Sequence, residues 1–153
     1  MQIFVRRGSE PDCELLELLE SEGRSSLDEF RGGSRLAKEI VAVAPNWLAA
    51  LNNKSVGIFV AGIDQTVMGY LLARLSTTVI GETATIEQVF VTKDARNLGV
   101  GDALISATVD WAKSLKIVAL DALALPGDRE TKNLYERAGL VARLITVTTD
   151  LRD

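Results

Sequence analysis

The chain has 153 residues, of which 47% are hydrophobic and 25% charged, and it carries a net charge of −4. This length and composition predict one domain over residues 1–153 with its own hydrophobic core. The acidic balance disfavours a phosphate-binding surface, so we expect no nucleic-acid partner. Because there is a single cysteine, Cys13, and no histidine, the sequence excludes an internal disulfide, histidine metal sites and histidine-dependent nucleophilic catalysis.

No apolar segment is long enough for a signal peptide or a transmembrane helix. The N-terminal stretch MQIFVRRGSEPD lacks an apolar run of signal-peptide length, and no later run could span a bilayer. We therefore expect a soluble, cytoplasmic protein with no membrane partner. Cys13 lies early in a leucine-rich segment, where a structural thiol in reducing surroundings is the expected role.

The first residues predict a strand followed by a helix. Residues 2–7 favour a short strand, and residues 9–21 favour a helix with Ser9 or Glu10 as its cap. Gly23 is expected to end that helix, since glycine disfavours the helix interior.

After a polar stretch over residues 23–33, helical spacing resumes over residues 34–53. Pro45 lacks an N–H and disfavours the helical conformation of Ala44, so we expect a break or kink there. We assign Trp47 to packing.

Three strand-like segments follow, at residues 56–63, 67–76 and 84–92, each rich in β-branched or aromatic side chains. The short connections, such as the turn at residues 64–65, predict an antiparallel meander.

Residues 101–116 predict an amphipathic helix that faces the core. Its apolar residues, together with the one just before it, recur at helical spacing, and Trp111 within this stripe is assigned to packing. The stripe consists of Val100, Ala103, Leu104, Ala107, Trp111 and Leu115.

The remaining chain predicts a strand over residues 117–125, a helix over residues 128–139 and a closing strand over residues 140–151. The first of these is almost entirely apolar, as expected when both faces are covered. The full element order predicts an α/β fold.

Two glycines stand between a predicted strand and the amphipathic helix. Gly99 and Gly101 leave the main chain bare at a helix N-terminus, where N–H groups and the helix dipole attract anions. Arg96 adds a forked cationic donor. A pyrophosphate suits this arrangement, although an isolated Gly-x-Gly is more often a turn.

Two common nucleotide motifs do not fit. Asp102 follows Gly101, so the lysine of a Walker loop is missing, and Leu104 stands where a dinucleotide fingerprint has its third glycine.

The motif Arg96-Asn97-Leu98-Gly99-Val100-Gly101, together with its flanking strand and helix, resembles the coenzyme A motif of the GNAT superfamily of N-acetyltransferases. The segments VMGYLLARL, VALDALALPGD and DRETKNLYERAGL resemble that family's third strand, fifth strand and closing helix. The resemblance implies the GNAT acyl-CoA N-acyltransferase fold, a mixed, mostly antiparallel twisted sheet with helices on both faces.

The departures from the family pattern are few. Asp128, Thr131 and Leu140 replace the usual asparagine, alanine and phenylalanine, and Asn97-Leu98 replaces a common glycine and basic residue. The missing basic residue would weaken coenzyme binding.

The resemblance implies acetyl-CoA as cosubstrate and no metal. The pantetheine arm would lie between the splayed fourth and fifth strands, bound by main-chain groups as a pseudo-strand. The expected cofactor-binding residues are Val89, Phe90, Val91, Arg96, Asn97, Leu98, Gly99, Val100, Gly101, Asp102 and Asp128.

Tyr135 is the candidate general acid, because it follows Asp128 by seven residues as the tyrosine follows the asparagine in the family motif. A phenol with a pKa of about 10 is protonated at pH 7 and could donate to a thiolate whose conjugate acid has a pKa of about 8.5. The alternative is a tyrosine that only packs.

An alkylammonium acceptor, with a pKa of about 10.4, must lose a proton before it attacks. Glu87, just before the expected coenzyme-binding residues, is the candidate base, directly or through water, and Glu82 is a weaker one. A solvated strand glutamate is the alternative for Glu87. Asp128, which follows Pro126-Gly127, is favoured as a helix N-cap over a ligand contact.

The sequence therefore predicts an acetyl-CoA-dependent N-acetyltransferase that acts on a primary amine of a small molecule or protein. Residues 23–55 should form much of the acceptor wall. The alternative is a non-catalytic acyl-CoA-binding or sensing module of the same fold. The sequence is also compatible with a homodimer.

Overall fold

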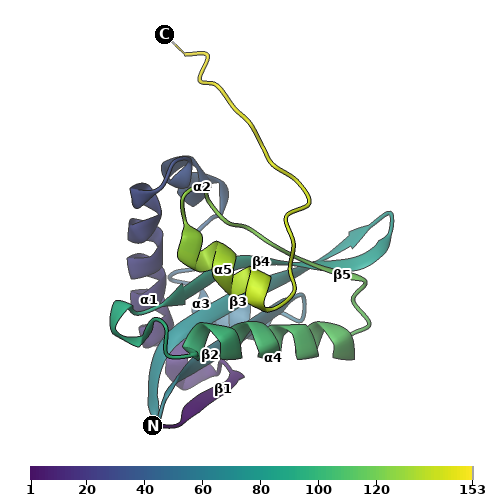
Figure 1. Cartoon of the computed structure of the whole chain (residues 1–153). Coiled ribbons are helices and arrows are strands. Elements are labelled where there is room, and N and C mark those ends of the chain that lie inside the picture. Colours follow the sequence, from purple (N-terminus) through teal and green to yellow (C-terminus); the bar gives the residue numbers. More distant parts are fainter. Residues whose placement is uncertain (153) are drawn as a thin grey trace.

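The computed structural model describes residues 1–152, and its centre is a five-stranded sheet in the order β1-β2-β3-β4-β5 (Figure 1). The strands β1 to β4 pair antiparallel, and β5 pairs parallel with β4. The predicted α/β fold with a mixed, mostly antiparallel sheet is confirmed. The strands are β1 (Ile3–Arg7), β2 (Val56–Ile63), β3 (Thr66–Thr78), β4 (Gly81–Val91) and β5 (Ala119–Ala122).

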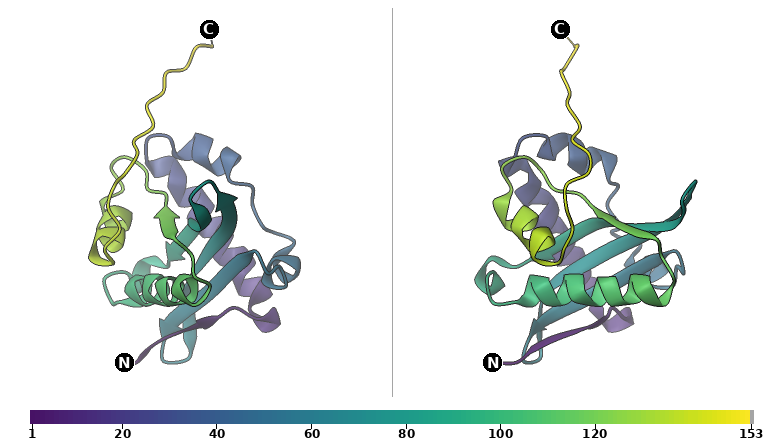
Figure 2. Two further views of the ribbon diagram at one scale, coloured as in Figure 1. Left: turned by 90° about the vertical axis from the view of Figure 1, so that its right-hand side faces the viewer. Right: turned by 45° about the vertical axis from the view of Figure 1, so that its right-hand side comes forward.

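Successive residues of the central strands enter two different hydrophobic cores. In β2, Ile58 and Val60 pack on one face, whereas Phe59 and Ala61 pack on the other. The alternation is the two-residue period of a strand, and both faces are apolar because helices cover both. Helix α4 (Val100–Ser114) covers one face, and α1 (Cys13–Ser26) with α3 (Trp47–Leu51) covers the other (Figure 2).

The first helix does not end at Gly23. A 3-10 turn capped by Ser9 precedes α1, which then continues to Ser26. A Cβ on Gly23 would lie 3.2 Å from atoms of the Phe90 side chain in β4. The glycine therefore serves close packing between helix and sheet, and the prediction of a helix end was wrong.

The predicted break at Pro45 is confirmed and is wider than one kink. Helix α2 (Gly33–Glu39) ends before Ile40, and α3 begins only at Trp47. Trp47 is buried and meets Tyr70 edge to face, with ring centroids 5.7 Å apart. Its predicted packing role is confirmed.

The apolar stripe of α4 packs against the core along the helix as far as Trp111. Leu104 is fully buried and Trp111 packs edge to face on Phe59, as predicted, whereas Leu115, the C-cap residue that follows the helix, is 46% exposed. Ile105 is fully buried as well.

The C-terminal part differs most from the prediction. β5 covers only four residues of the expected 117–125, and α5 (Arg129–Arg137) is shorter than the expected helix. The predicted closing strand over 140–151 is wrong, because that segment pairs with no strand and extends away from the body (Figures 1 and 2).

We expect Leu104→Ala to lower the free energy of unfolding by about 2–5 kcal/mol, because it leaves a cavity in the core beneath α4. Leu115→Ala, at the C-cap of the same helix, should lower it by less than about 1 kcal/mol, since nearly half of that residue is already exposed to solvent. Urea denaturation of both variants measures the difference. Equal losses would contradict the assigned orientation of the helix.

Candidate active site

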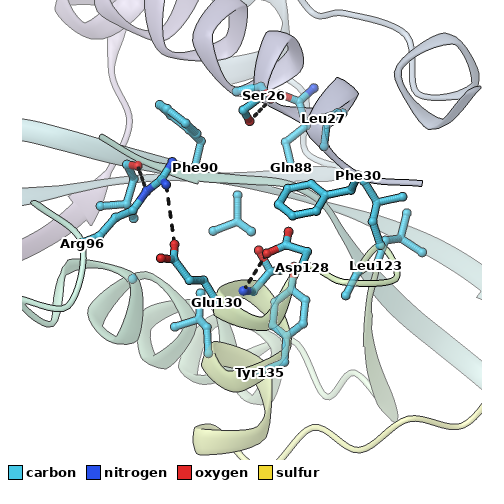
Figure 3. A pocket seen from close by; sticks show the side chains of 18 of the residues that line it. Ser26, Leu27, Phe30, Gln88, Phe90, Arg96, Leu123, Asp128, Glu130 and Tyr135 are labelled. Atoms are coloured by element: carbon cyan, nitrogen blue, oxygen red, sulfur yellow. Dashed lines mark hydrogen bonds and ion pairs between the residues drawn. The ribbon is translucent and has the colours of Figure 1, made fainter. Parts of the chain in front are cut away.

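A cavity of about 460 Å³ lies between the C-terminal half of β4, the end of β5 and helices α1, α2 and α5 (Figure 3). Most of the predicted site residues line it, and only Leu98 and Val100 do not. Val100 is instead fully buried in the core, and Leu98 is 39% exposed. The predicted residues that line the cavity are Glu87, Val89, Phe90, Val91, Arg96, Asn97, Gly99, Gly101, Asp102, Asp128 and Tyr135.

The cavity begins where β4 loses one of its two neighbours. The pairing of β4 with β5 ends at Ile86, opposite Ala122. Glu87 is the extra residue of a β-bulge, since Gln88 and Ile86 face consecutive residues of β3. Bulges bend a strand and end pairing. Residues 88–91 therefore pair with β3 alone, and their other edge faces the cavity.

The carbonyl of Val91 illustrates this open edge. It accepts a hydrogen bond from Nε of Arg96, at 3.2 Å, instead of one from a strand. The Arg96 guanidinium also lies 5.8 Å from the centroid of the Phe90 ring and 3.6 Å from a carboxylate oxygen of Glu130 (Figure 3). Arg96 thus bridges β4 and α5 across one end of the cavity.

The start of α4 offers main-chain donors without acceptors. In the part of the chain that the structure describes, no main-chain N–H of residues 97–102 donates to a main-chain carbonyl with hydrogen-bond geometry, and no side chain caps Gly99. These donors lie at the positive end of a 15-residue helix. The arrangement suits an anion such as a phosphate.

The structure requires glycine at the two positions of this turn for different reasons. Gly99 has φ +95°, a left-handed conformation that costs other residues energy. Gly101 is helical, but a Cβ there would lie 3.2 Å from Leu134 of α5. The absent side chain therefore lets α5 approach α4 at the edge of the cavity.

The ring of Tyr135 is buried in the core, and the residue also lines the cavity. The ring belongs to the core cluster beneath α4, and the residue is 7% exposed. Burial raises the pKa of its phenol, and the Asp128 carboxylate raises it further. The hydroxyl donates to no group among the described residues. It is thus a protonated donor without a protein partner.

Asp128 caps α5, as predicted, because its carboxylate accepts a hydrogen bond of 3.2 Å from the N–H of Thr131. Figure 3 shows its side chain next to Tyr135 on one side of the cavity. The cap fixes the start of the helix that carries the tyrosine.

The two glutamates considered as bases lie at different ends of β4. Glu87 lines the cavity and forms an ion pair of 3.1 Å with Arg74. Glu82 does not line the cavity, and it accepts a hydrogen bond of 2.6 Å from the Thr77 hydroxyl. Only Glu87 is placed where a bound molecule could meet it.

Sequence reasoning missed a buried polar network behind the cavity. Glu20, 1% exposed, accepts hydrogen bonds from the N–H groups of Val43 and Ala44 and from the Gln88 side chain. Gln88 in turn accepts from the Tyr70 hydroxyl at 2.6 Å. The available signal was position, because Glu20 follows Leu16 by four residues and so shares the buried face of α1.

The opposite end of the cavity is apolar. Phe30 and Leu123 lie there, away from Arg96 and Phe90 (Figure 3). The segment expected to form the acceptor wall contributes residues only up to Ile40. Arg24 holds this wall in place, since its guanidinium donates to the carbonyls of Ala37 and Ile40.

Over residues 1–152, no helix is both long and apolar enough to cross a membrane. The same residues contain no group of three or more metal-ligating side chains that could hold an ion.

The comparisons with known proteins agree with this geometry. Residues 17–140 match the Acetyltransferase (GNAT) family. Comparison with curated protein sequences gave no match.

Similar solved structures include an aminoglycoside acetyltransferase, meta-AAC0020, from an uncultured soil metagenomic sample, with TM-score 0.72, 16% identity and coverage of 98% of this chain and 97% of that one. AAC(6')-Iy bound to a bisubstrate analog, CoA-S-monomethyl-acetylneamine, gives TM-score 0.72 at 16% identity over 100% of both chains. A ribosomal-protein-alanine N-acetyltransferase from Brucella melitensis biovar Abortus 2308 gives TM-score 0.70 at 16% identity, covering 98% of this chain and 100% of that one.

At such identities the structural likeness shows the fold, and the family match extends over most of the sequence. The chain therefore belongs to the GNAT family of acetyltransferases.

Proposed function

We propose that the protein is an acetyl-CoA-dependent N-acetyltransferase, which moves an acetyl group from the thioester to a primary amine by direct attack. One observation carries the proposal: the open edge of β4, the unpaired N–H groups of residues 97–102 and the Tyr135 phenol line or border a single cavity. Acetyl-CoA supplies an activated acetyl group when it is bound.

The residues present fit the cosubstrate in two parts. The N–H groups at the start of α4, with Arg96 beside them, would hold the pyrophosphate. Main-chain groups of Val89 and Val91 would pair with the amides of the pantetheine arm, because this edge of β4 has no strand neighbour. One N–H of the same edge would polarise the thioester carbonyl.

Tyr135 donates its proton to the departing thiolate in this proposal. Its position supports the role, because its hydroxyl lies at the cavity without a protein partner; burial raises the pKa of the phenol, so the proton stays on the oxygen until a strongly basic thiolate forms beside it. Glu87 would remove the proton of the acceptor ammonium, directly or through a water molecule. This role is supported by its position, because Glu87 is the bulge residue at which the open edge of β4 begins, and it lines the cavity.

The acceptor is a primary amine of a small molecule or of a protein. The structurally similar proteins are named for both classes, aminoglycosides and a ribosomal-protein alanine. The apolar end of the cavity at Phe30 and Leu123 would contact the carbon skeleton next to the amine.

The direct test is calorimetric titration with acetyl-CoA and CoA, followed by a thiol-release assay against a panel of primary amines. We expect binding of both nucleotides and release of CoA with at least one amine. Absence of binding would refute the proposal. Binding without turnover on any amine would favour the alternative, a non-catalytic acyl-CoA-binding or sensing module.

We expect Tyr135→Phe to lower kcat on the order of 10²-fold, because the thiolate then leaves without a proton donor. The dissociation constant of CoA and the free energy of unfolding should change little, since the ring stays in the same packing position. Steady-state kinetics and calorimetry on the same preparation test both parts. Unchanged kcat would assign Tyr135 to packing alone.

Glu87→Gln should lower kcat/KM on the order of 10²-fold with an ammonium acceptor, because a neutral amide cannot take the proton. Glu82→Gln is the matched control, since it makes the same change on the same strand outside the cavity. The control should keep the activity of the parent protein. If both variants retained full activity, water alone would accept the proton.

A further inference from the structure

The apolar end of the cavity, away from Arg96, is formed by two segments from different parts of the chain. One is the turn and helix over residues 27–40, and the other is the loop over residues 123–125. The two segments touch, because a Cβ on Gly33 would lie 3.3 Å from the Leu125 side chain. The apolar side chains of these segments that line the cavity are Leu27, Phe30, Leu36, Ile40, Leu123 and Leu125.

Phe30 is held by hydrogen bonds on both sides of its main chain. Its N–H donates to the carbonyl of Leu27 at 3.1 Å, and its carbonyl accepts from the N–H of Gly33 at 3.0 Å. Figure 3 shows its ring pointing into the cavity beside Leu123. The residue is half-buried, so a bound molecule could cover the rest of the ring.

Helix α2 and its C-cap carry two more of these apolar side chains. Leu36 and Ile40 are four residues apart, and the N–H of Ile40 donates to the carbonyl of Leu36 at 2.9 Å, so both lie on one side of the helix. The guanidinium of Arg24 on α1 donates to the carbonyls of Ala37 and Ile40. The apolar surface is therefore held in place by the protein itself.

The polar side chains between α1 and β4 that line the cavity already bond to the protein. The Ser26 hydroxyl donates to the carbonyl of Gly23 at 2.7 Å. The Tyr70 hydroxyl donates to Gln88 at 2.6 Å, and the Gln88 amide donates to Glu20 at 3.0 Å. A bound molecule with many hydroxyl groups would therefore find few free partners here.

The carboxylates that line the cavity are either paired or solvated. Glu29 is exposed, so water solvates its carboxylate. A ligand with several ammonium groups would have to replace existing partners or bind at the solvated rim. The carboxylates that already accept from or pair with protein groups are Glu87, Asp102, Asp128 and Glu130.

We propose that the acceptor is a primary amine with one ammonium group on an apolar skeleton, aromatic or aliphatic, and that Phe30 selects it by packing against that skeleton. The inference rests on the proposed acetyl transfer, which brings the amine to Tyr135 and Glu87 and leaves its skeleton at the apolar end. Burial of apolar surface favours binding, whereas hydroxyl groups that leave water without new partners disfavour it. The cavity therefore discriminates against polyhydroxylated amines and diamines.

The test compares four amines in the thiol-release assay at saturating acetyl-CoA. Phenylethylamine and hexylamine have apolar skeletons, hexamethylenediamine adds a second ammonium to the hexyl chain, and a hexose with its amine on the terminal carbon adds hydroxyl groups. We expect kcat/KM for the two monoamines to exceed that for the other two by about 10-fold or more. An equal or higher value for the diamine or the aminosugar would overturn the proposal.

Phe30→Ala should raise KM for phenylethylamine about 10-fold, because the variant loses the ring that covers the acceptor skeleton. Val41→Ala is the control, since Val41 follows the same segment but is 79% exposed and does not line the cavity. The control should keep the KM of the parent protein. An unchanged dissociation constant of CoA in both variants would show that they are folded, and an unchanged KM in folded Phe30→Ala would overturn the selecting role of Phe30.

Calorimetric titration of the same amines into the protein with bound CoA separates this inference from the proposed function. Tighter binding of the monoamines without any turnover would refute acetyl transfer and support the selectivity. Turnover with equal or tighter binding of the aminosugar or the diamine would support acetyl transfer and refute the selectivity. If no amine bound and none was acetylated, both proposals would fail.

Discussion

The bulge at Glu87 ends the pairing of β4 with β5, and the rest of the site is arranged around that interruption. A strand in the middle of a sheet normally satisfies its main chain on both sides, whereas the last residues of β4 do so on one side only. The cavity occupies the other side, and the start of α4 meets it at one end. The loss of a few ladder hydrogen bonds thus leaves unpaired main-chain groups along one side of the cavity.

The two halves of the cavity use different chemistry. The half at α4 is built from peptide N–H groups and from glycines at Gly99 and Gly101, so its shape follows from backbone conformation and helix packing. The half at α1 and α2 is built from side chains such as Phe30 and Leu36. A main-chain surface tolerates many sequences that keep its backbone conformation, whereas a side-chain surface changes with each substitution. The difference fits a fixed donor and a variable acceptor.

Periodicity predicted most of the fold, because the elements bury regular patterns. The alternation in β2 and the helical spacing of Leu104 and Trp111 could be read directly from the sequence. The bulge at Glu87 could not be, since it depends on the register of the opposite strand. Gly23 suggested a helix end because the sequence does not show that Phe90 packs against it. Residues 140–151 have the composition of a strand, but the sequence does not show that no neighbouring strand pairs with them.

Glu20 joins two segments that are far apart in sequence, since one carboxylate holds the main chain at Val43 and Ala44 and the side chain of Gln88 on β4. The stretch between α1 and this attachment is therefore held by hydrogen bonds at fixed points. Arg24 adds two of them by donating to the main-chain carbonyls of Ala37 and Ile40. These hydrogen bonds involve no side chain of residues 27–40, so cavity-lining side chains such as Phe30 and Leu36 can change without breaking them. Gly33 is an exception, because a Cβ there would lie 1.7 Å from the carbonyl oxygen of Leu27. Substitutions at these positions therefore change the lining of the cavity while the distance from this segment to β4 stays constant.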